Sequence, residues 1–331
     1  MTKPFVTSAA RLSRRSVLLG AAGMSLALGA HAQSASYPSR PVQLIVAAPP
    51  GGPSDVLARQ LADGLTKELG QPVVIDNRPG AGGTLAAEAA LRAAPDGHSL
   101  MMSWIGNATA PALLPKVSFD INRDFVHISQ MVAGANILVV HPSTGFRTLD
   151  DLLTHARKHP GRLSYASAGN GSSGHLVMEL LKQRAGVSML HIPYKGGAPA
   201  MNDLLSGQVD LMFINQDAVI PHQQSGRLIP LAITSTQRNA MFPNLPTVAE
   251  SFAGFEATAW AGVSAPKGTP AAIVERVHAA TLKALSGPMR AKQEATGAQI
   301  VGSSPAQFTQ FVRDETTKWT QVIRTANIKV D

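Results

Sequence analysis

The sequence predicts an α/β fold made of two lobes that face each other. From Pro41 onward, short apolar runs alternate with helical patterns, which is typical of sheets covered by helices. Two glycine-rich turns, residues 49–55 and 169–174, occupy equivalent places, each between an apolar run and a helical pattern. The C-terminal third lacks enough strands for a sheet of its own, so we expect it to complete the first lobe.

In the first part of the chain the pattern predicts three strands and two helices. The helix after the first glycine turn has apolar residues at the spacing of one buried face. These residues are Val56, Leu57, Leu61, Leu65 and Leu69. The predicted strands are residues 42–47, 73–76 and 100–102, and the predicted helices are residues 55–69 and 84–94. We expect residues 104–109 to form the exit loop of the third strand.

The middle of the chain repeats this alternation. Thr148 to Asp151 is similar to a capping box with Asp in place of Glu, and it predicts a helix that runs toward Lys158. The predicted strands are residues 137–140, 163–167, 189–192, 211–214 and 231–234, and further helices are predicted at 175–184 and 198–205. The alternation predicts a parallel sheet with helical cover.

The C-terminal third begins with a strand-like run, residues 257–265, and continues with two helical patterns. Ser304 and Pro305 supply the N-cap and first-turn proline of the final helix. We infer that the chain returns to the first lobe near Ala257, so that residues 130–135 and 257–264 form a two-strand hinge. The predicted domains are an export signal at 1–32, lobe 1 at 33–135 plus 259–331, and lobe 2 at 136–258.

The N-terminus predicts export from the cytoplasm. Four basic residues, ending with Arg14 and Arg15, precede an uncharged stretch from Ser16 to Ala30, and small residues around His31 provide a cleavage site. The adjacent arginines resemble a twin-arginine signal, while a general secretory signal remains the alternative. The uncharged stretch is short for a membrane anchor. We therefore expect a periplasmic protein whose residues 1–32 are removed.

Composition excludes several classes of function. The chain of 331 residues has a net charge of +8 but no later Lys/Arg stripe, and its aromatic content is 5%, so a nucleic-acid-binding surface is unsupported. The absence of cysteine excludes disulfides, thiolate metal sites and cysteine nucleophiles. A hydrophobic content of 44% is sufficient for a sizeable core.

The two glycine-rich turns predict anion binding. A turn between a strand and a helix presents unpaired backbone N–H groups and the positive end of the helix dipole. Glycine also lets these N–H groups approach a carboxylate closely, which replaces the hydrogen bonds that the carboxylate loses on leaving water. Two such turns on facing lobes would bind one solute from both sides and favour the closed arrangement.

Several motifs, in this order along nearly the whole mature chain, resemble the Bug family of extracytoplasmic solute receptors for tripartite tricarboxylate transporters. These motifs are residues 50–55, 77–83, 96–97, 169–176, 193–196, 207–210, 245–250 and 265–270. The resemblance implies a type II-like periplasmic binding protein, with two α/β lobes, a two-strand hinge and a ligand cleft between the lobes. It implies no catalysis and no cofactor.

The resemblance further implies a small carboxylate as ligand and the membrane subunits of such a transporter as partners, with a sensor protein as the alternative partner. We expect a monomer. Together with the turn chemistry, it indicates the following ligand-binding residues. They are Gly51, Gly52, Pro53, Ser54, Asp55 and Trp104 in lobe 1, and Ala168, Gly169, Asn170, Gly171, Ser172, Ser173, Asn215 and Asp217 in lobe 2.

Some of these residues have a purely structural interpretation. Asp55 caps its helix in the interpretation that we favour, because a second carboxylate would repel an anion, although an amine on the solute would reverse that preference. Ser172 and Ser173 are candidates for caps or for ligand contacts. Asn215 and Asp217 follow a strand end, where specificity groups often lie, but an ordinary surface loop explains them nearly as well.

The tryptophans have two interpretations as well. Trp104 and Trp260 together could form an apolar wall for an aromatic or alkyl solute, whereas large aromatic residues are more often part of the core. Trp260 lies on a predicted hinge strand. Trp104 departs from the small polar residues that the family resemblance implies in that loop, so it could alter the choice of ligand.

The strongest competing motif has glycines at 169, 171 and 174, the spacing of a dinucleotide fingerprint. It leaves an exported NADP-dependent oxidoreductase as the alternative function. The next strand ends without the acidic residue that would hold a ribose, although Lys195 could bind a 2′-phosphate. His155 and His159 have metal-ligand spacing without a catalytic acid between them, so a solvated helix face is the preferred interpretation and no metal site is expected.

Overall fold

The computed structural model describes residues 37–51, 53–114, 116–194 and 196–328. The predicted signal at 1–32, Gly52 and Lys195 therefore lie outside the described residues. The elements discussed below all belong to one compact unit that begins at Arg40. No helix in the described ranges is both long enough and apolar enough to cross a membrane.

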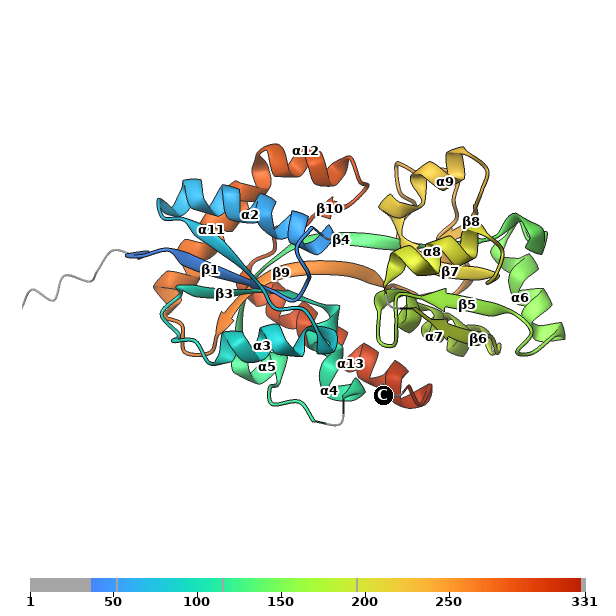
Figure 1. The fold of residues 1–331 in the computed structure, drawn as a ribbon, viewed down its shortest axis with the longest axis horizontal. Helices are drawn as coiled ribbons and strands as arrows, with labels where there is room; N and C mark the ends of the chain where they lie inside the picture. Colours follow the sequence, from blue (N-terminus) through green and yellow to red (C-terminus); the bar gives the residue numbers. More distant parts are fainter. Residues whose placement is uncertain (1–36, 52, 115, 195, 329–331) are drawn as a thin grey trace, which may run out of the picture. The chain divides into compact units, whose positions relative to one another are not determined.

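The strands form two groups that are joined by two crossing strands (Figure 1). The strands are β1 (Val42–Val46), β2 (Val73–Asn77), β3 (Ser99–Trp104), β4 (Phe125–Val140), β5 (Ser164–Ser167), β6 (Leu190–Pro193), β7 (Leu211–Asn215), β8 (Ile229–Ile233), β9 (Thr258–Pro266) and β10 (Gln299–Ile300). Their order is β2-β1-β3-β9-β4-β7-β5-β6, with β8 and β10 also paired to β4.

Strand β4 pairs with strands of both groups, whereas β9 pairs with β3 and β4 only and runs antiparallel to both. The first part of β4 pairs with β9, whereas its last residues, Asn136–Val140, pair with β7. Both strands cover the segments that the sequence predicted as hinge strands. The prediction of parallel sheets holds for β1 with β2 and β3, and for β5 with β6 and β7. It is wrong where β9 and β4 intervene, because each returns in the opposite direction.

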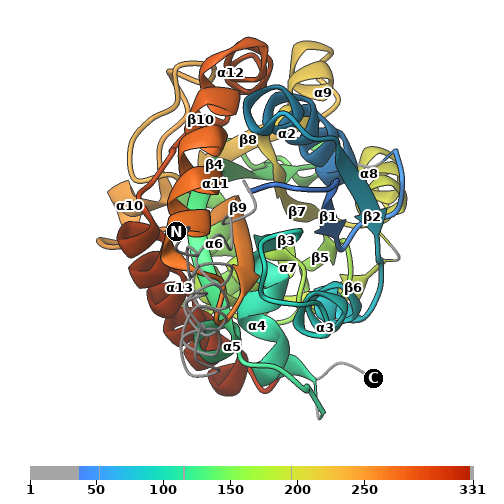
Figure 2. The same ribbon diagram turned by 90° about the vertical axis from the view of Figure 1, so that its left-hand side faces the viewer.

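Helices cover both faces of each strand group. They are α2 (Pro53–Leu69), α3 (Thr84–Leu91), α4 (Ile105–Leu113), α5 (Ile121–Asp124), α6 (Leu149–Lys158), α7 (Ser173–Ala185), α8 (Gly197–Leu205), α9 (Ile220–Gln224), α10 (Val248–Ser251), α11 (Ala271–Ser286), α12 (Pro288–Glu294) and α13 (Pro305–Thr325). Short 3₁₀ turns occur at η1 (Ala81–Gly83), η2 (Pro142–Thr144) and η3 (Gln216–Ala218). In Figure 2, α2 and α11 lie on one side of β1 and β3, and α3 and α4 on the other.

Two helix starts confirm the capping signals in the sequence. Thr148 Oγ1 accepts the N–H of Asp151 at the start of α6, and the Asp151 carboxylate accepts the N–H of Thr148 in return. Ser304 and Gln307 form the same reciprocal pair at the start of α13, with Pro305 as its first residue. These side chains satisfy N–H groups that the helix itself leaves unpaired.

The expected exit loop at 104–109 is wrong, because α4 begins directly after Trp104. The Asn107 side chain accepts the N–H of Trp104 over 3.1 Å, which starts the helix without a preceding loop. Asn107 is fully buried and also donates to the carbonyl of Gly83. The small and polar residues of this segment show no apolar periodicity that would predict a helix. The hydrogen bonds of Asn107 fix the start of the helix instead.

Helix α13 packs into the cores of both strand groups. Phe308 and Val312 pack with Ile45 and Met101 of the first group. Nearer the end of α13, three other side chains pack with Leu138, Tyr165 and Phe213 of the second group. These side chains are Trp319, Val322 and Ile323. The helix therefore links the two groups, in addition to the crossing strands.

Candidate ligand-binding site

A cavity of about 990 Å³ is lined by residues from both strand groups. Most of the residues that the sequence assigned to the ligand lie on its wall. They are Gly51, Ser54, Trp104, Ala168, Asn170, Gly171, Ser172, Ser173, Asn215 and Asp217. The two glycine turns, more than a hundred residues apart in the sequence, thus border one cavity.

The remaining assigned residues have other places. Pro53 begins α2, and Gly52 lies outside the described residues. Asp55 and Gly169 are absent from the cavity wall. Gly169 has a φ of 122° and uses its carbonyl to accept the N–H of Ser172, so it shapes the second turn from within.

Asp55 is the internal anion of the first turn. Its side chain is 1% exposed and accepts the N–H of Gly51 over 2.9 Å, the amide of Asn77 over 2.9 Å and two N–H groups of Arg59. The Arg59 guanidinium, followed by the Gly51 N–H, holds the pKa of this carboxyl well below its usual range. This geometry gives Asp55 a structural role, although not that of the expected helix cap, because Asp55 is the third residue of α2 and accepts an N–H from ahead of the helix. It also occupies the Gly51 N–H, one of the donors that the sequence assigned to a solute.

The second turn leaves a polar group without a partner. Ser172 is the N-cap of α7, but its side chain makes no cap hydrogen bond. Its Oγ is buried and has no hydrogen-bond partner among the described residues, although Ser172 lies on the cavity wall. A buried hydroxyl without a partner costs free energy, so a solute oxygen at this point would stabilise it.

Several helices begin at the cavity wall. Ser54 is in the first turn of α2, Gly83 is the N-cap of α3, Ile105 and Gly106 open α4, and Ser173 opens α7. The first N–H groups of a helix lack acceptors inside it, and together with the helix dipole they attract negative charge. The cavity therefore suits an anion, although Asp217 and Lys292 are its only charged side chains among the described lining residues.

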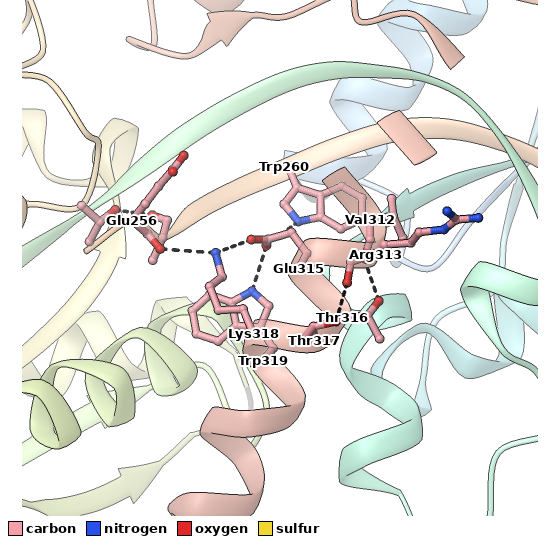
Figure 3. A network of polar contacts seen from close by, with 11 residues as sticks. Glu256, Trp260, Val312, Arg313, Glu315, Thr316, Thr317, Lys318 and Trp319 are labelled. Carbon is pink, nitrogen blue, oxygen red and sulfur yellow. Dashed lines mark hydrogen bonds and ion pairs between the residues drawn. The ribbon is translucent and has the colours of Figure 1, made fainter. Parts of the chain in front are cut away.

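The two tryptophans differ in role. Trp104 is partly exposed on the cavity wall. Trp260 contributes to the wall but is 4% exposed, and its indole packs against Phe308 and Phe311. Figure 3 shows the Trp260 N–H directed at the Glu315 carboxylate. Trp260 is thus mainly a core residue, and Trp104 remains the candidate apolar wall.

Sequence reasoning missed the part of the cavity wall that α12 and the residues just after it provide. Lys292, Gln293 and Thr296 line the cavity, and so does Gln216, which lies directly between two residues that the sequence did assign. The Gln216 side chain is almost fully buried and donates to the carbonyl of Thr296 over 3.1 Å. The position of Gln216 next to Asn215 in the sequence could have indicated that it lines the cavity. Nothing in the sequence of α12 indicated the same for its residues.

A family model described as "Tripartite tricarboxylate transporter family receptor" matches residues 57–328. The chain belongs to this family. Protein BugT of Bordetella pertussis is 37% identical to it over 323 residues, which cover 95% of this chain and 98% of the relative. This match and the family model confirm the Bug-family resemblance of the sequence motifs.

Two solved structures of the family have the same fold. An R. palustris protein solved with adipate has a TM-score of 0.78 and 34% identity, and covers 89% of this chain and 100% of its own. MatC from Rhodopseudomonas palustris, solved with bound malate, has a TM-score of 0.75 and 32% identity, with 87% and 100% coverage. These likenesses confirm the two-lobe periplasmic-binding-protein fold.

Family membership identifies the chain as a solute-binding receptor rather than an enzyme. The NADP-dependent alternative has no support, because the family model and the ligand-bound structures that this chain resembles are those of solute-binding proteins. A small-molecule ligand and a transporter partner follow from the family. Its solved members include periplasmic binding proteins.

Proposed function

We propose that this receptor closes its two lobes around a small carboxylate in the periplasm and presents it to the membrane subunits of a tripartite tricarboxylate-type transporter. One observation carries the proposal: the unpartnered Ser172 hydroxyl and the first turns of several helices border one cavity between the strand groups. The malate and adipate bound by relatives support a carboxylate as the solute.

The carboxylate is bound mainly by lobe 2 in this proposal. Ser172 and Ser173 supply hydroxyls and the first N–H groups of α7, while Asn170 and Asn215 supply side-chain amides at the rim. Lobe 1 contributes Ser54, and Trp104 provides an apolar surface for the body of the solute. Asp55 shapes the first turn and does not contact the solute.

The lobe limits and the cellular route complete the proposal. Lobe 1 comprises residues 33–135 plus 259–331, and lobe 2 comprises residues 136–258. Removal of residues 1–32 after export, through a twin-arginine-like signal, delivers the mature protein to the periplasm. There it acts as a monomer that takes one solute in the cavity between its lobes.

The test is calorimetric titration of the purified mature protein with malate, adipate and a panel of aromatic and aliphatic carboxylates. The matched primary amides, which have the same shape without the charge, serve as controls. Binding of a carboxylate but not of its amide supports the proposal. Binding of none of the carboxylates, or equal binding of the amides, contradicts it.

A pair of variants then tests the site. Ser172→Ala removes the unpartnered hydroxyl and should weaken carboxylate binding about tenfold, the effect of one lost hydrogen bond to a charged group. Ser225→Ala is the control, because Ser225 is exposed on the surface of lobe 2 and away from the cavity wall. Equal affinity of wild type and Ser172→Ala would remove Ser172 from the site.

A further inference from the structure

Two stacked histidines lie directly beneath the second glycine turn. The rings of His175 and His191 are 3.9 Å apart between centroids and 8° from parallel. Tyr165 stacks on His191 at 4.7 Å and extends the column. His175 is 4% exposed and stands on α7, whereas His191 belongs to β6, so the stack joins two elements behind the cavity wall.

The His175 ring accepts a backbone hydrogen bond from the turn. The N–H of Gly171 donates to Nδ1 of His175 over 3.0 Å, and this bond is buried. A nitrogen that accepts an N–H carries no proton itself, so neutral His175 has its proton on Nε2. Gly171 has a φ of 76°, a conformation open mainly to glycine, and this acceptor holds it there.

The His191 ring reaches the other glycine of the turn through one hydroxyl. Its Nε2 lies 2.7 Å from Oγ of Ser167, and the same Oγ accepts the N–H of Gly169 over 3.1 Å. The backbone N–H groups of Gly169 and Gly171 are therefore both tied to the histidine pair, one directly and one through Ser167.

We propose that His175, supported by His191, is a positioning residue of the carboxylate site. The pair fixes the backbone of Gly169–Ser172 so that Ser172 and the first N–H groups of α7 face the cavity. Neither ring lines the cavity, so both act through the turn. This inference rests on the proposed function and names the residues that preorganise its binding turn.

The surroundings keep the acceptor nitrogen unprotonated at neutral pH. Burial, assisted by His191 and Lys182, lowers the pKa of His175 to about 3. Burial also lowers the pKa of His191 to about 4. The charge of Glu179 raises this pKa and the charge of Lys182 lowers it, both by less than burial does. Tyr165 of β5 and the Glu179–Lys182 pair of α7 are the other titratable groups at the stack. A protonated His175 could no longer accept the Gly171 N–H.

The first experiment needs no ligand. NMR of the ¹⁵N-labelled mature protein should show scalar coupling between the Gly171 nitrogen and Nδ1 of His175 across their hydrogen bond, and should place the His175 proton on Nε2. In His175→Phe, which keeps a stacked ring but lacks the acceptor, the amide signals of Gly169 to Ser172 should shift or broaden. A proton on Nδ1, or unchanged turn signals in His175→Phe, overturns the proposal.

The second experiment measures affinity for malate and adipate. His175→Phe should bind the better of the two about tenfold more weakly, whereas His175→Asn, whose side-chain oxygen can replace Nδ1, should recover most of the affinity. His155→Phe is the matched control, since His155 of α6 also contacts a second histidine ring, that of His159, but lies away from the cavity wall. Equal weakening by His175→Asn and His175→Phe would indicate a packing role and overturn the proposal.

The two experiments separate the inference from the proposed function. If the wild type binds neither malate nor adipate, the proposed function fails for these solutes, while the NMR measurement still decides whether His175 holds the turn.

Discussion

The indole N–H of Trp260 donates to the Glu315 carboxylate over 3.0 Å, which joins crossing strand β9 to helix α13 (Figure 3). The indole of Trp319 donates to the same oxygen over 2.8 Å, and Lys318 forms an ion pair with the carboxylate. Lys318 also donates to the carbonyl of Glu256, just before β9. One buried carboxylate thus anchors α13 where the chain crosses between the lobes.

Glu315→Ala should destabilise the receptor by about 2–4 kcal/mol, because it leaves two buried indole N–H groups without an acceptor. Glu315→Gln keeps an acceptor oxygen and should cost less. Chemical denaturation gives both free energies of unfolding. Asp314→Ala, on the exposed side of the same helix, is the control and should stay within about 0.5 kcal/mol of wild type. A similar loss in Asp314→Ala and Glu315→Ala would contradict the anchoring role.

Acid should destabilise the receptor through its buried neutral histidines. Burial lowers the pKa of His127 to about 4, below the value near 6.5 in the unfolded chain. Between these values the unfolded state binds more protons than the folded state, so stability is complete above pH 6.5 and falls as the pH drops toward 4. His127 alone should account for about 2 kcal/mol between pH 7.5 and pH 5.

Denaturant titrations of wild type and His127→Phe at both pH values measure this effect. The stability difference between the two pH values should shrink in His127→Phe, because the titrating group is gone. Phe125→Leu also loses packing but no titrating group, so it should lower stability equally at both pH values. An unchanged pH dependence in His127→Phe would show that His127 is not the source.

A polar contact across the cavity should stabilise the closed arrangement. Gln216 of η3 donates to the carbonyl of Thr296, and Asn239 donates both to Gln216 and to the carbonyl of Gly297. The bonds to Thr296 and Gly297 link segments that the sequence places in different lobes, whereas the bond between Asn239 and Gln216 lies within lobe 2. Gln216→Ala removes the bond to Thr296 and should shift the receptor toward an open form, because only the closed form loses this bond between the lobes.

Distance measurements between a fluorescent label on each lobe would detect this shift in the absence of ligand. Affinity should fall several-fold in Gln216→Ala, with the loss mainly in the dissociation rate. Gln223→Ala, an exposed glutamine of α9, provides the control. Identical label distances in wild type and Gln216→Ala would show that this contact does not stabilise the closed form.

Gly171→Ala should weaken ligand binding. A Cβ at Gly171 would lie 2.5 Å from Cδ1 of Leu113 in α4, and the φ of 76° is unfavourable for alanine. Gly186→Ala has a similar positive φ but no atom within 4 Å of the added Cβ, so it isolates the backbone strain. Calorimetric titration of both variants compares them. Normal affinity in Gly171→Ala would show that the turn tolerates displacement.

The sequence predicted much of the local structure because local signals encode it. Ser304 and Pro305 began the last helix, and Thr148 with Asp151 began α6, as their capping chemistry requires. The same reasoning failed at residues 104–109, where a buried Asn107 starts a helix through contacts with a distant turn. The α12 segment and its cavity residues were also missed, since short helices stabilised by tertiary packing have weak periodicity.

By itself, the sequence determined the alternation of strands and helices, the two glycine turns and the family to which they belong, because spacing and turn chemistry are local properties. Only the tertiary structure decided which donors remain free. Gly51 and Gly171 belong to similar turns, yet Asp55 accepts the first N–H and His175 the second, while the Ser172 hydroxyl has no partner among the described residues. Hydrogen bonds depend on distance and direction, which arise when separate segments pack together.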